Sequence, residues 1–318
     1  MKKSIVIILS IFLLTAVVAL SGCTSQQATN TTASPTTAAQ YPMTVTDDYG
    51  RNISIPSEPQ RIISLSSENT EILFALGLGD RVVADNDYDD YPADAVNKTK
   101  VGGLTNINIE KVASLSPDVV FANTLNPKDS VQKLDTLGLK VVVNNISDAR
   151  GIDNAILRVG KICNVSDNAT KLVNSIDAQV KNVTDKTSAL NASQKPKVLM
   201  LVDIDYLYVA GSDSYGDDLI RMAGGQNVGS NLTSYAVMSK EAILQADPDI
   251  IIVPVDQYSQ AAFDGMTKGV NQSWMQGLTA LKNGKVYAIN ADIISRQSPR
   301  VADGVQAMAR DIHPELFS

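Results

Sequence analysis

Apolar and polar residues alternate in two short runs that flank a turn-rich segment. The runs are Met43–Thr46 and Asn52–Ile55, and the segment between them, Asp47–Arg51, contains Gly50. Alternation with a period of two is typical of strands with one buried face, and Asp and Gly favour the turn between paired strands. The pattern therefore predicts a β-hairpin.

After the hairpin, short apolar runs alternate with segments that have a helical period. The predicted strands are Arg61–Leu65, Val82–Ala84, Val119–Ala122 and Val141–Val143. The predicted helices are Glu68–Leu76, Ile109–Leu115 and Lys128–Leu137. Strands that alternate with helices predict a mostly parallel sheet covered by helices on both faces.

Between residues 152 and 190 the pattern contains helices without strands. One apolar stripe runs from Ile152 to Ile162, the chain breaks at Asn164–Asp167, and a second stripe runs from Leu172 to Val183. The second helix, with about twenty-two residues, would span ~33 Å. It is long enough to pass from one lobe to another. Strands return at Val198–Val202, and a final helix lies near Pro299–Ile312.

An internal repeat indicates two equivalent lobes. Residues 108–122 align without gaps to residues 239–253. Each copy has a residue suited to cap a helix, a glutamate two positions later, a short helix, Pro-Asp and a buried strand. We therefore predict an α/β fold with two Rossmann-like lobes, one long linking helix and a ligand cleft. The predicted boundaries are 41–147 for the first lobe, 148–194 for the linking helical segment and 195–318 for the second lobe.

The first forty residues predict export and membrane attachment. Two lysines precede the uncharged stretch Ile5–Leu20, which is shorter than the ~20 apolar residues of a spanning helix. Leu20–Cys23 then resembles the lipobox of bacterial and some archaeal lipoproteins, in which the cysteine is lipidated. We expect residues 1–22 to be a signal peptide and residues 23–40 to be a disordered tether, because they lack an apolar face. The alternative is an ordinary secretory signal with a chance cysteine.

Composition narrows the possible partners. The formal net charge is −7, which argues against a nucleic-acid partner. The mature chain would keep only Cys163 besides Cys23, so no disulfide is expected within its folded part. Ten Asn-x-Ser/Thr sequons fit glycosylation of an exported protein, although an Asn- and Thr-rich chain also contains such sequons by chance. They are Asn30, Asn52, Asn97, Asn145, Asn164, Asn168, Asn182, Asn191, Asn231 and Asn271.

Catalytic and metal chemistry have little support in the sequence. The only histidine, His313, is next to Pro314 near the end of the chain, which argues against a Ser-His-Asp triad or a His-Cys zinc site. The acidic segment Asp85–Asp90 lacks the glycine and glutamate of a calcium loop. We interpret it as a polar loop at the carboxyl end of a strand, where α/β proteins bind ligands. We therefore predict no enzyme activity, no cofactor and no metal site.

Several segments resemble the substrate-binding proteins of ABC importers for cobalamin and for iron–siderophore or haem complexes. The resemblance covers Thr44–Ile312. Arg61–Ser66 and Asn69–Gly77 are similar to the opening strand and helix of this class. The cobalamin binders are the most similar members, because they share Tyr88–Pro92, Asn108–Lys111 and Asp292–Arg300.

This resemblance implies a ligand site between the lobes and two docking sites. The implied ligand-contacting residues are Tyr88, Tyr208, Tyr235, Asp292 and Arg296. The residues of the second lobe have structural alternatives. Tyr208 could be a strand residue that faces the core, Tyr235 could anchor a loop, and Asp292 and Arg296 could pair with each other on the surface. Leu104 departs from the class, which can carry tryptophan there.

The resemblance also implies that Glu110 and Glu241 dock onto the permease subunits, one from each lobe. The alternative is that both are helix N-terminal carboxylates. The expected protein is a monomeric, lipid-anchored binder of a corrinoid on the outer face of the cytoplasmic membrane. A ferric siderophore or haem is the alternative ligand, and a structural surface lipoprotein is the alternative from another class.

Overall fold

The computed structural model describes residues 39–317, so the predicted signal peptide, Cys23 and most of the predicted tether lie outside the described residues. The described chain begins with the predicted hairpin. Its strands β1 (Met43–Thr46) and β2 (Asn52–Ile55) pair antiparallel, with Thr44 opposite Ser54. The bounds of both strands agree with the alternation in the sequence.

The first lobe contains a five-stranded parallel sheet in the order β5-β4-β3-β6-β7. Its strands are β3 (Ile62–Ser64), β4 (Val82–Asp85), β5 (Thr99–Lys100), β6 (Val119–Asn123) and β7 (Val141–Asn144). Its helices are α1 (Ser67–Ala75), η1 (Gly79–Arg81), α2 (Ala93–Val96), α3 (Ile109–Ser114) and α4 (Lys128–Thr136). Strands β6 and β7 are buried along their whole length because helices cover both faces of the sheet.

The second lobe contains a six-stranded sheet. Its main path is β11-β9-β8-β12-β13, and β10 pairs with β8. Strands β8, β10, β12 and β13 pair parallel to one another, whereas β9 pairs antiparallel with its two neighbours, β8 and β11. Their bounds are β8 (Lys197–Asp203), β9 (Tyr208–Ala210), β10 (Gln226–Asn227), β11 (Tyr235–Val237), β12 (Ile250–Val255) and β13 (Val286–Asn290).

The helices of the second lobe cover both faces of this sheet. They are α7 (Tyr215–Met222), α8 (Lys240–Ala246), α9 (Gln260–Thr267), η3 (Ser273–Gly277), α10 (Thr279–Lys282), α11 (Ala291–Ser295), α12 (Val301–Ile312) and α13 (Pro314–Phe317). The 3-10 turn η2 (Ala192–Gln194) precedes the sheet. The mostly parallel α/β architecture is therefore present in both lobes.

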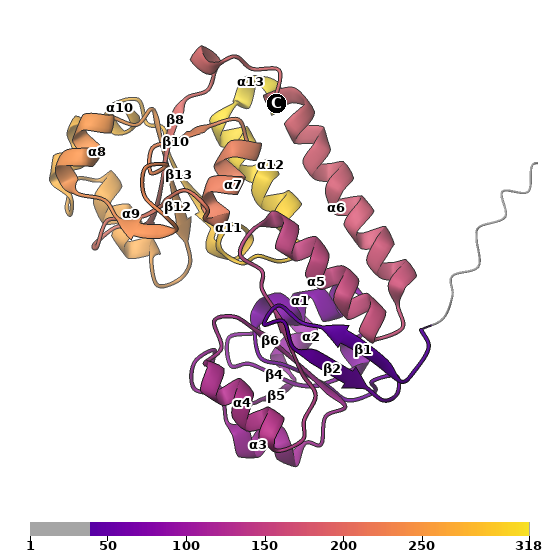
Figure 1. The fold of residues 1–318 in the computed structure, drawn as a ribbon. Coiled ribbons are helices and arrows are strands. Elements are labelled where there is room, and N and C mark those ends of the chain that lie inside the picture. Colours follow the sequence, from indigo (N-terminus) through magenta and orange to yellow (C-terminus); the bar gives the residue numbers. More distant parts are fainter. Residues whose placement is uncertain (1–38, 318) are drawn as a thin grey trace, which may run out of the picture. The chain divides into compact units, whose positions relative to one another are not determined.

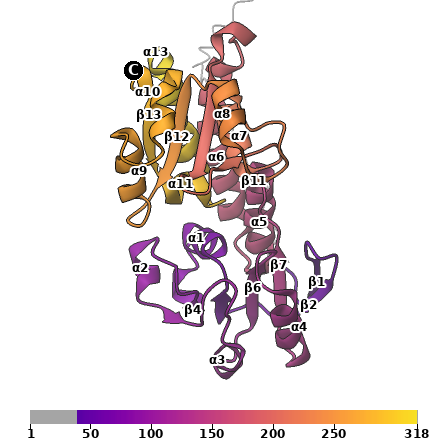
Figure 2. The ribbon, with the colours of Figure 1, turned by 90° about the vertical axis from the view of Figure 1, so that its left-hand side faces the viewer.

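Two helices connect the lobes. Helix α5 (Ala149–Ile162) packs against α1 of the first lobe, and α6 (Ser166–Thr187) packs against α5, α7 and α12. Figure 1 shows α6 running beside both lobes, and Figure 2 shows α1 and α11 at the junction between the two sheets. The 22 residues of α6 agree with the predicted length of the linking helix.

The hydrophobic core continues from one lobe to the other. One buried cluster includes Phe121 of the first sheet, Ile156 of α5, Ile176 of α6 and Met200 of the second sheet. Two further clusters fill the opposite faces of the two sheets. Because the linking helices contribute to the continuous cluster, burial of apolar area holds them against both lobes.

The internal repeat corresponds to one structural unit in each lobe. In the first lobe, Asn108 caps α3, since its side-chain oxygen accepts a hydrogen bond from Lys111 N at 2.9 Å. In the second lobe, Ser239 caps α8, since its hydroxyl accepts one from Ala242 N at 3.2 Å. A buried strand follows each helix. In residues 39–317, no helix is both long and apolar enough to cross a membrane.

Candidate ligand-binding site

A cleft of about 770 Å³ lies where the carboxyl ends of strands from the two sheets meet. The segment after β4 forms one wall, and the segments after β12 and β13 form the other. The residues that line it are Asp87, Tyr88, Asp89, Asp90, Val96, Lys100, Val255, Asp256, Gln257, Tyr258, Asn290, Asp292 and Arg296. This location agrees with the rule that α/β proteins bind ligands beyond the carboxyl ends of parallel strands.

The loop after β4 is held by hydrogen bonds among its own side chains and from Thr70 of α1. Asn86 Nδ2 donates to Asp89 Oδ1 at 2.8 Å, and Thr70 Oγ1 donates to Asp89 Oδ2 at 2.6 Å. Asn86 Oδ1 also accepts a hydrogen bond from Tyr88 N at 2.8 Å. This turn fixes the backbone of Tyr88, whose side chain is 66% exposed in the cleft.

A buried acid lies beneath this loop. Asp85, at the end of β4, is fully buried, and Lys100 Nζ lies 2.9 Å from its Oδ1. Lys100 also donates to the carbonyl oxygens of Asp89 and Ala95 at 3.0 and 3.1 Å. Burial raises the pKa of Asp85 to about 6, against the opposing effect of the lysine. The first-lobe wall therefore contains a carboxyl group that titrates in mildly acidic conditions.

Charged groups from both lobes pair beside the cleft. Arg296 Nη1 lies 2.6 Å from Asp90 Oδ1 of the first lobe, and Arg296 Nη2 lies 3.0 Å from Asp292 Oδ1. Burial acts to raise the pKa of Asp90, but the hydrogen bond and charge of Arg296 hold it below its ordinary value. Arg296 is one-fifth exposed, so it can contact a ligand and still bridge the lobes. The pairing of Asp292 with Arg296, which was the structural alternative to ligand contact, is present, and Asp90 is a third partner.

The other two predicted tyrosines lie outside the lining of this cleft. Tyr208 of β9 is opposite Val237 of β11, and Tyr235 of β11 is opposite Ala210. The hydroxyl of Tyr235 accepts a hydrogen bond from Gly216 N at 3.1 Å, and its ring packs against the continuous core. Tyr208 remains 40% exposed. The structure therefore brings together Tyr88, Asp292 and Arg296, and it places Tyr208 and Tyr235 on a neighbouring pair of strands.

Sequence reasoning missed seven of the residues that line the cleft: Val96, Lys100, Val255, Asp256, Gln257, Tyr258 and Asn290. Among them, Tyr258 has a large ring and is 83% exposed. The signal that could have found it is the order of residues 256–259, Asp-Gln-Tyr-Ser, directly after a buried strand. An Asp at a strand end that is followed closely by Ser favours a side-chain-capped turn, which places the next residues at the sheet edge.

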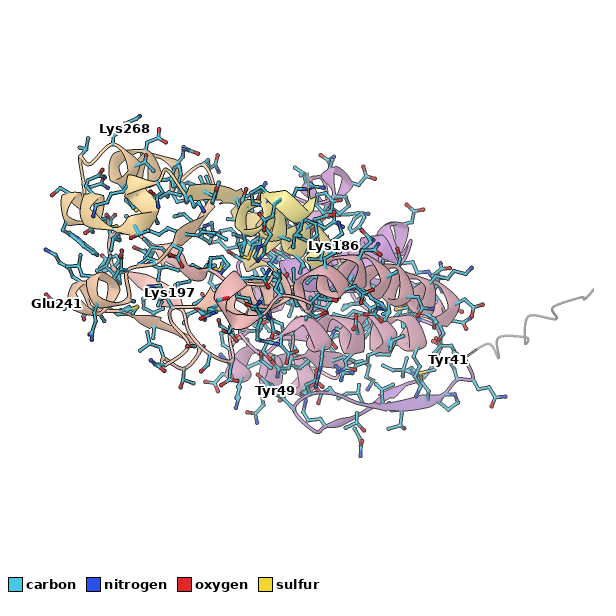
Figure 3. The ribbon with its side chains drawn as sticks, turned by 90° about the horizontal axis from the view of Figure 1, so that it is seen from above. Tyr41, Tyr49, Lys186, Lys197, Glu241 and Lys268 are labelled. Atoms are coloured by element: carbon cyan, nitrogen blue, oxygen red, sulfur yellow. The ribbon has the colours of Figure 1, made fainter. Side chains whose placement is uncertain are left out.

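The two repeat glutamates are exposed near the starts of α3 and α8. Within residues 39–317, neither carboxylate has an ion-pair or hydrogen-bond partner. A hollow between α3 and α4 adjoins Glu110 and is lined by Ile109, Asp129, Gln132, Lys133, Thr136 and Leu137. Glu241 projects outward from the end of the second lobe (Figure 3), and Leu244, one turn along α8, is exposed.

The remaining candidates for chemistry have structural roles. The His313 ring lies 3.0 Å from Glu315 Oε1 and 3.2 Å from the carbonyl oxygen of Gly224, and it is buried. Cys163 is also buried, as its place on the apolar face predicts, and burial raises the pKa of its thiol to about 12. The described part of the chain has no cluster of three or more acidic, histidine or cysteine side chains placed to hold a metal.

The fold and cleft define a bilobal solute-binding protein, and residues 62–293 match the family described as periplasmic binding protein. The chain belongs to this family, whose members are substrate-binding proteins for transport rather than enzymes. It is 30% identical over 313 residues to an uncharacterised ABC transporter substrate-binding lipoprotein of Bacillus subtilis, covering 96% of each chain. It therefore acts outside the cytoplasmic membrane with an ABC permease.

Two further similar proteins have a stated ligand. The chain is 26% identical over 257 residues to a vitamin B12-binding protein of Vibrio parahaemolyticus, covering 80% of this chain and 90% of the relative. The solved structure of the periplasmic vitamin B12 binding protein of Vibrio cholerae is 25% identical, with a TM-score of 0.71. That match covers 83% of this chain and all of the other.

Proposed function

We propose that this protein captures a corrinoid of the cobalamin type in the interlobe cleft and delivers it to the permease of an ABC importer. The observation that carries the proposal is that Tyr88, Asp292 and Arg296 line one cleft between the lobes. An exposed ring suits the flat, largely apolar face of a corrin, and a charged pair suits its peripheral amides. The ligands named for the two vitamin B12-binding proteins support this choice.

Tyr208 and Tyr235 belong to the same proposal as ligand contacts from the second lobe. Tyr208 supplies the partly exposed ring of this pair. Tyr235 already uses its hydroxyl within the protein, so it would offer the edge or face of its ring. Truncation of a ring that packs on the ligand should cost ~1–3 kcal/mol of binding free energy.

Titration calorimetry with cyanocobalamin and cobinamide tests the proposal. We expect submicromolar affinity for the wild type and a loss of ~1–3 kcal/mol for Tyr208→Ala. Haemin and a ferric catecholate siderophore serve as the competing ligands. No saturation with either corrinoid, together with clear saturation by one of these iron compounds, would replace the corrinoid by that compound.

We also propose that Glu110 and Glu241 dock the two lobes onto the two transmembrane subunits, with the binding protein acting as a monomer. Both are exposed, both lack a partner among the described residues, and each lies at the equivalent place in one copy of the repeat. An exposed leucine lies near each of them, Leu137 across the hollow and Leu244 on α8. Acid next to an apolar side chain suits an interface with arginine and apolar groups.

Lipid attachment at Cys23 completes the proposed arrangement. The described chain begins at the junction of α5 and α6, where Ala39 N donates to Asn164 Oδ1 at 2.8 Å and the Tyr41 hydroxyl donates to Ile162 O at 2.6 Å. Figure 3 labels Tyr41 at this junction. The folded part would therefore be joined to the membrane at one fixed point beside the linking helix.

A further inference from the structure

Two exposed tyrosines, one from each lobe, are held at the cleft by the same local device. Asn86 Oδ1 accepts a hydrogen bond from Tyr88 N at 2.8 Å, and Asp256 Oδ1 accepts one from Tyr258 N at 2.8 Å. In both cases the acceptor follows the end of a parallel strand, β4 or β12, and the tyrosine comes two residues later. The two turns therefore present their rings at the sheet edges that meet in the cleft.

The turn beneath Tyr258 is reinforced by Ser259. Asp256 Oδ1 also accepts hydrogen bonds from Ser259 N and Ser259 Oγ, both at 2.8 Å. In return, Asp256 N donates a hydrogen bond to Ser259 Oγ at 2.9 Å. The hydrogen bonds from Ser259 hold the pKa of Asp256 below its ordinary value, so the carboxylate stays ionised at neutral pH. The backbone that carries Tyr258 is therefore fixed before any ligand arrives.

Within the described residues, the ring of Tyr258 makes no hydrogen bond and is not part of the hydrophobic core. The Tyr258 side chain is 83% exposed, and its hydroxyl has no hydrogen-bond partner in residues 39–317. The cleft gives it a neighbour of the same kind in Tyr88, together with the polar groups of Asn290 and Arg296. A hydrogen-bonded turn at a ligand cleft that holds a large ring exposed to solvent indicates that the ring contacts the ligand on binding.

The geometry points to Tyr258 as a specificity-determining residue that faces Tyr88 across the bound ligand, so that the site takes a large ligand with two flat, apolar faces. This inference rests on the proposed function, because it names the ring that contacts the second face of the same ligand. A tyrosine loses little conformational freedom when it stacks, since it has two side-chain torsions and a backbone that is already fixed. The phenol hydroxyl is not required for this role.

The test is a ring series at residue 258 in the full-length chain, purified in detergent and titrated with cyanocobalamin. We expect Tyr258→Ala to weaken binding by ~10-fold or more, and Tyr258→Phe and Tyr258→Trp to stay within ~3-fold of the wild type. Val270→Ala, which truncates an equally exposed side chain of the same lobe outside the cleft lining, should stay within ~2-fold. Thermal unfolding of each variant verifies its fold. If the alanine variant is unfolded, the affinities of the phenylalanine and tryptophan variants test the inference.

The outcomes separate this inference from the proposed function. In the first outcome, the wild type binds cyanocobalamin and Tyr258→Ala binds it with an affinity within ~2-fold of the wild type, or the phenylalanine and tryptophan variants lose as much affinity as the alanine variant. Either result overturns the role of the ring and leaves the corrinoid function in place. If the wild type saturates with haemin but not with cyanocobalamin, the same series with haemin decides the role of Tyr258, and only the corrinoid assignment falls. If the wild type binds neither flat ligand, both proposals are overturned.

Discussion

The guanidinium of Arg300 lies against the carboxylate of Glu71, although 229 positions separate them in the sequence. Arg300 Nε donates to Glu71 Oε2 at 2.8 Å, and Arg300 Nη2 donates to Glu71 Oε1 at 2.5 Å. Glu71 belongs to α1 of the first lobe, and Arg300 is the residue before α12 of the second. With the pair between Arg296 and Asp90, this contact joins the lobes directly, independently of the linking helix.

Removal of one partner of this interlobe pair should destabilise the protein strongly. The side chain of Glu71 is only 2% exposed and that of Arg300 15%, so Glu71→Gln or Arg300→Met leaves a charge in a poorly hydrated place. We expect a loss of ~3–5 kcal/mol of unfolding free energy for either change, measured by urea denaturation. The double variant should lose less than the sum of the single losses.

The exposed pair of Lys181 and Asp185 on α6 provides the control. It has a short Nζ–Oδ1 distance of 2.5 Å, but both side chains are more than 60% exposed. Lys181→Met should therefore change the unfolding free energy by less than ~1 kcal/mol. Equal effects at Lys181 and Arg300 would show that burial does not strengthen the interlobe pair.

The elements of this fold could be predicted because their signals are local. The period of the apolar residues determines which face an element buries. The structure confirms the strands predicted from the alternation in Met43–Thr46 and Asn52–Ile55, and it confirms the helix predicted from the apolar stripe of α6. The helix caps of the repeat are also local, and they too are confirmed.

The interlobe contacts could not be predicted in this way. Glu71 and Arg300 each look like ordinary polar residues in their own segments, and their contact depends on how the linking helices place the two lobes. The same holds for Tyr258, which reaches the cleft only because β12 ends opposite the loop after β4. The class resemblance supplied Tyr88, Asp292 and Arg296, which the structure places in one cleft.

The close packing of α5 on α6 requires Gly160. A β-carbon at this position would lie 2.3 Å from Ala169 Cβ, and Ala169 is fully buried. Gly160→Ala should therefore lower the unfolding free energy by ~1–3 kcal/mol, despite the higher helix propensity of alanine. Gly277→Ala is the control, because a β-carbon there meets nothing within 4 Å. A Gly160→Ala variant as stable as the wild type would contradict the helix contact as described.

Asp85 should give stability a pH dependence in the acidic range. Its pKa is raised to about 6 in the folded protein, above the ~4 of an unfolded aspartate, so between these values the folded state binds a proton that the unfolded state releases. Stability should thus fall as pH rises from ~4 to ~6, and the full loss should persist above that range.

Asp85→Asn removes this titration, while Lys100 keeps its two carbonyl acceptors. The stability of the variant relative to the wild type should increase by ~1–2 kcal/mol between pH 4 and pH 7, in urea unfolding at a series of pH values. A difference between Asp85→Asn and the wild type that does not change with pH would refute the assignment.

Lipid attachment predicts a clear change in partitioning. In a host that processes lipoproteins, the wild type should enter the membrane or detergent phase, whereas Cys23→Ala should remain in the aqueous phase, because each buried CH₂ of an acyl chain contributes ~0.8 kcal/mol. Mass spectrometry of the mature N-terminus verifies cleavage. Equal partitioning of two correctly cleaved proteins would exclude the lipobox.

The docking proposal predicts that Glu110 and Glu241 affect transport without affecting folding or capture. Each carboxylate is exposed near the start of a short helix, so its loss should cost less than ~1 kcal/mol of stability through the helix dipole. An interface ion pair that is desolvated on docking loses ~2–5 kcal/mol when one partner is removed. The double variant Glu110→Ala/Glu241→Ala should therefore bind the ligand like the wild type.

The same double variant should strongly reduce ligand uptake and the ATP hydrolysis that the binding protein stimulates in its importer. Each single variant should have a smaller effect, because the repeat assigns one contact to each lobe. Lys111→Ala, next to Glu110 on α3, is the matched control for loss of an adjacent charged side chain on the same helix, and it should transport normally. Normal transport by the double variant would mean that both glutamates only stabilise the starts of their helices. A failure of ligand capture would be recognised separately, because it would lower the measured ligand affinity.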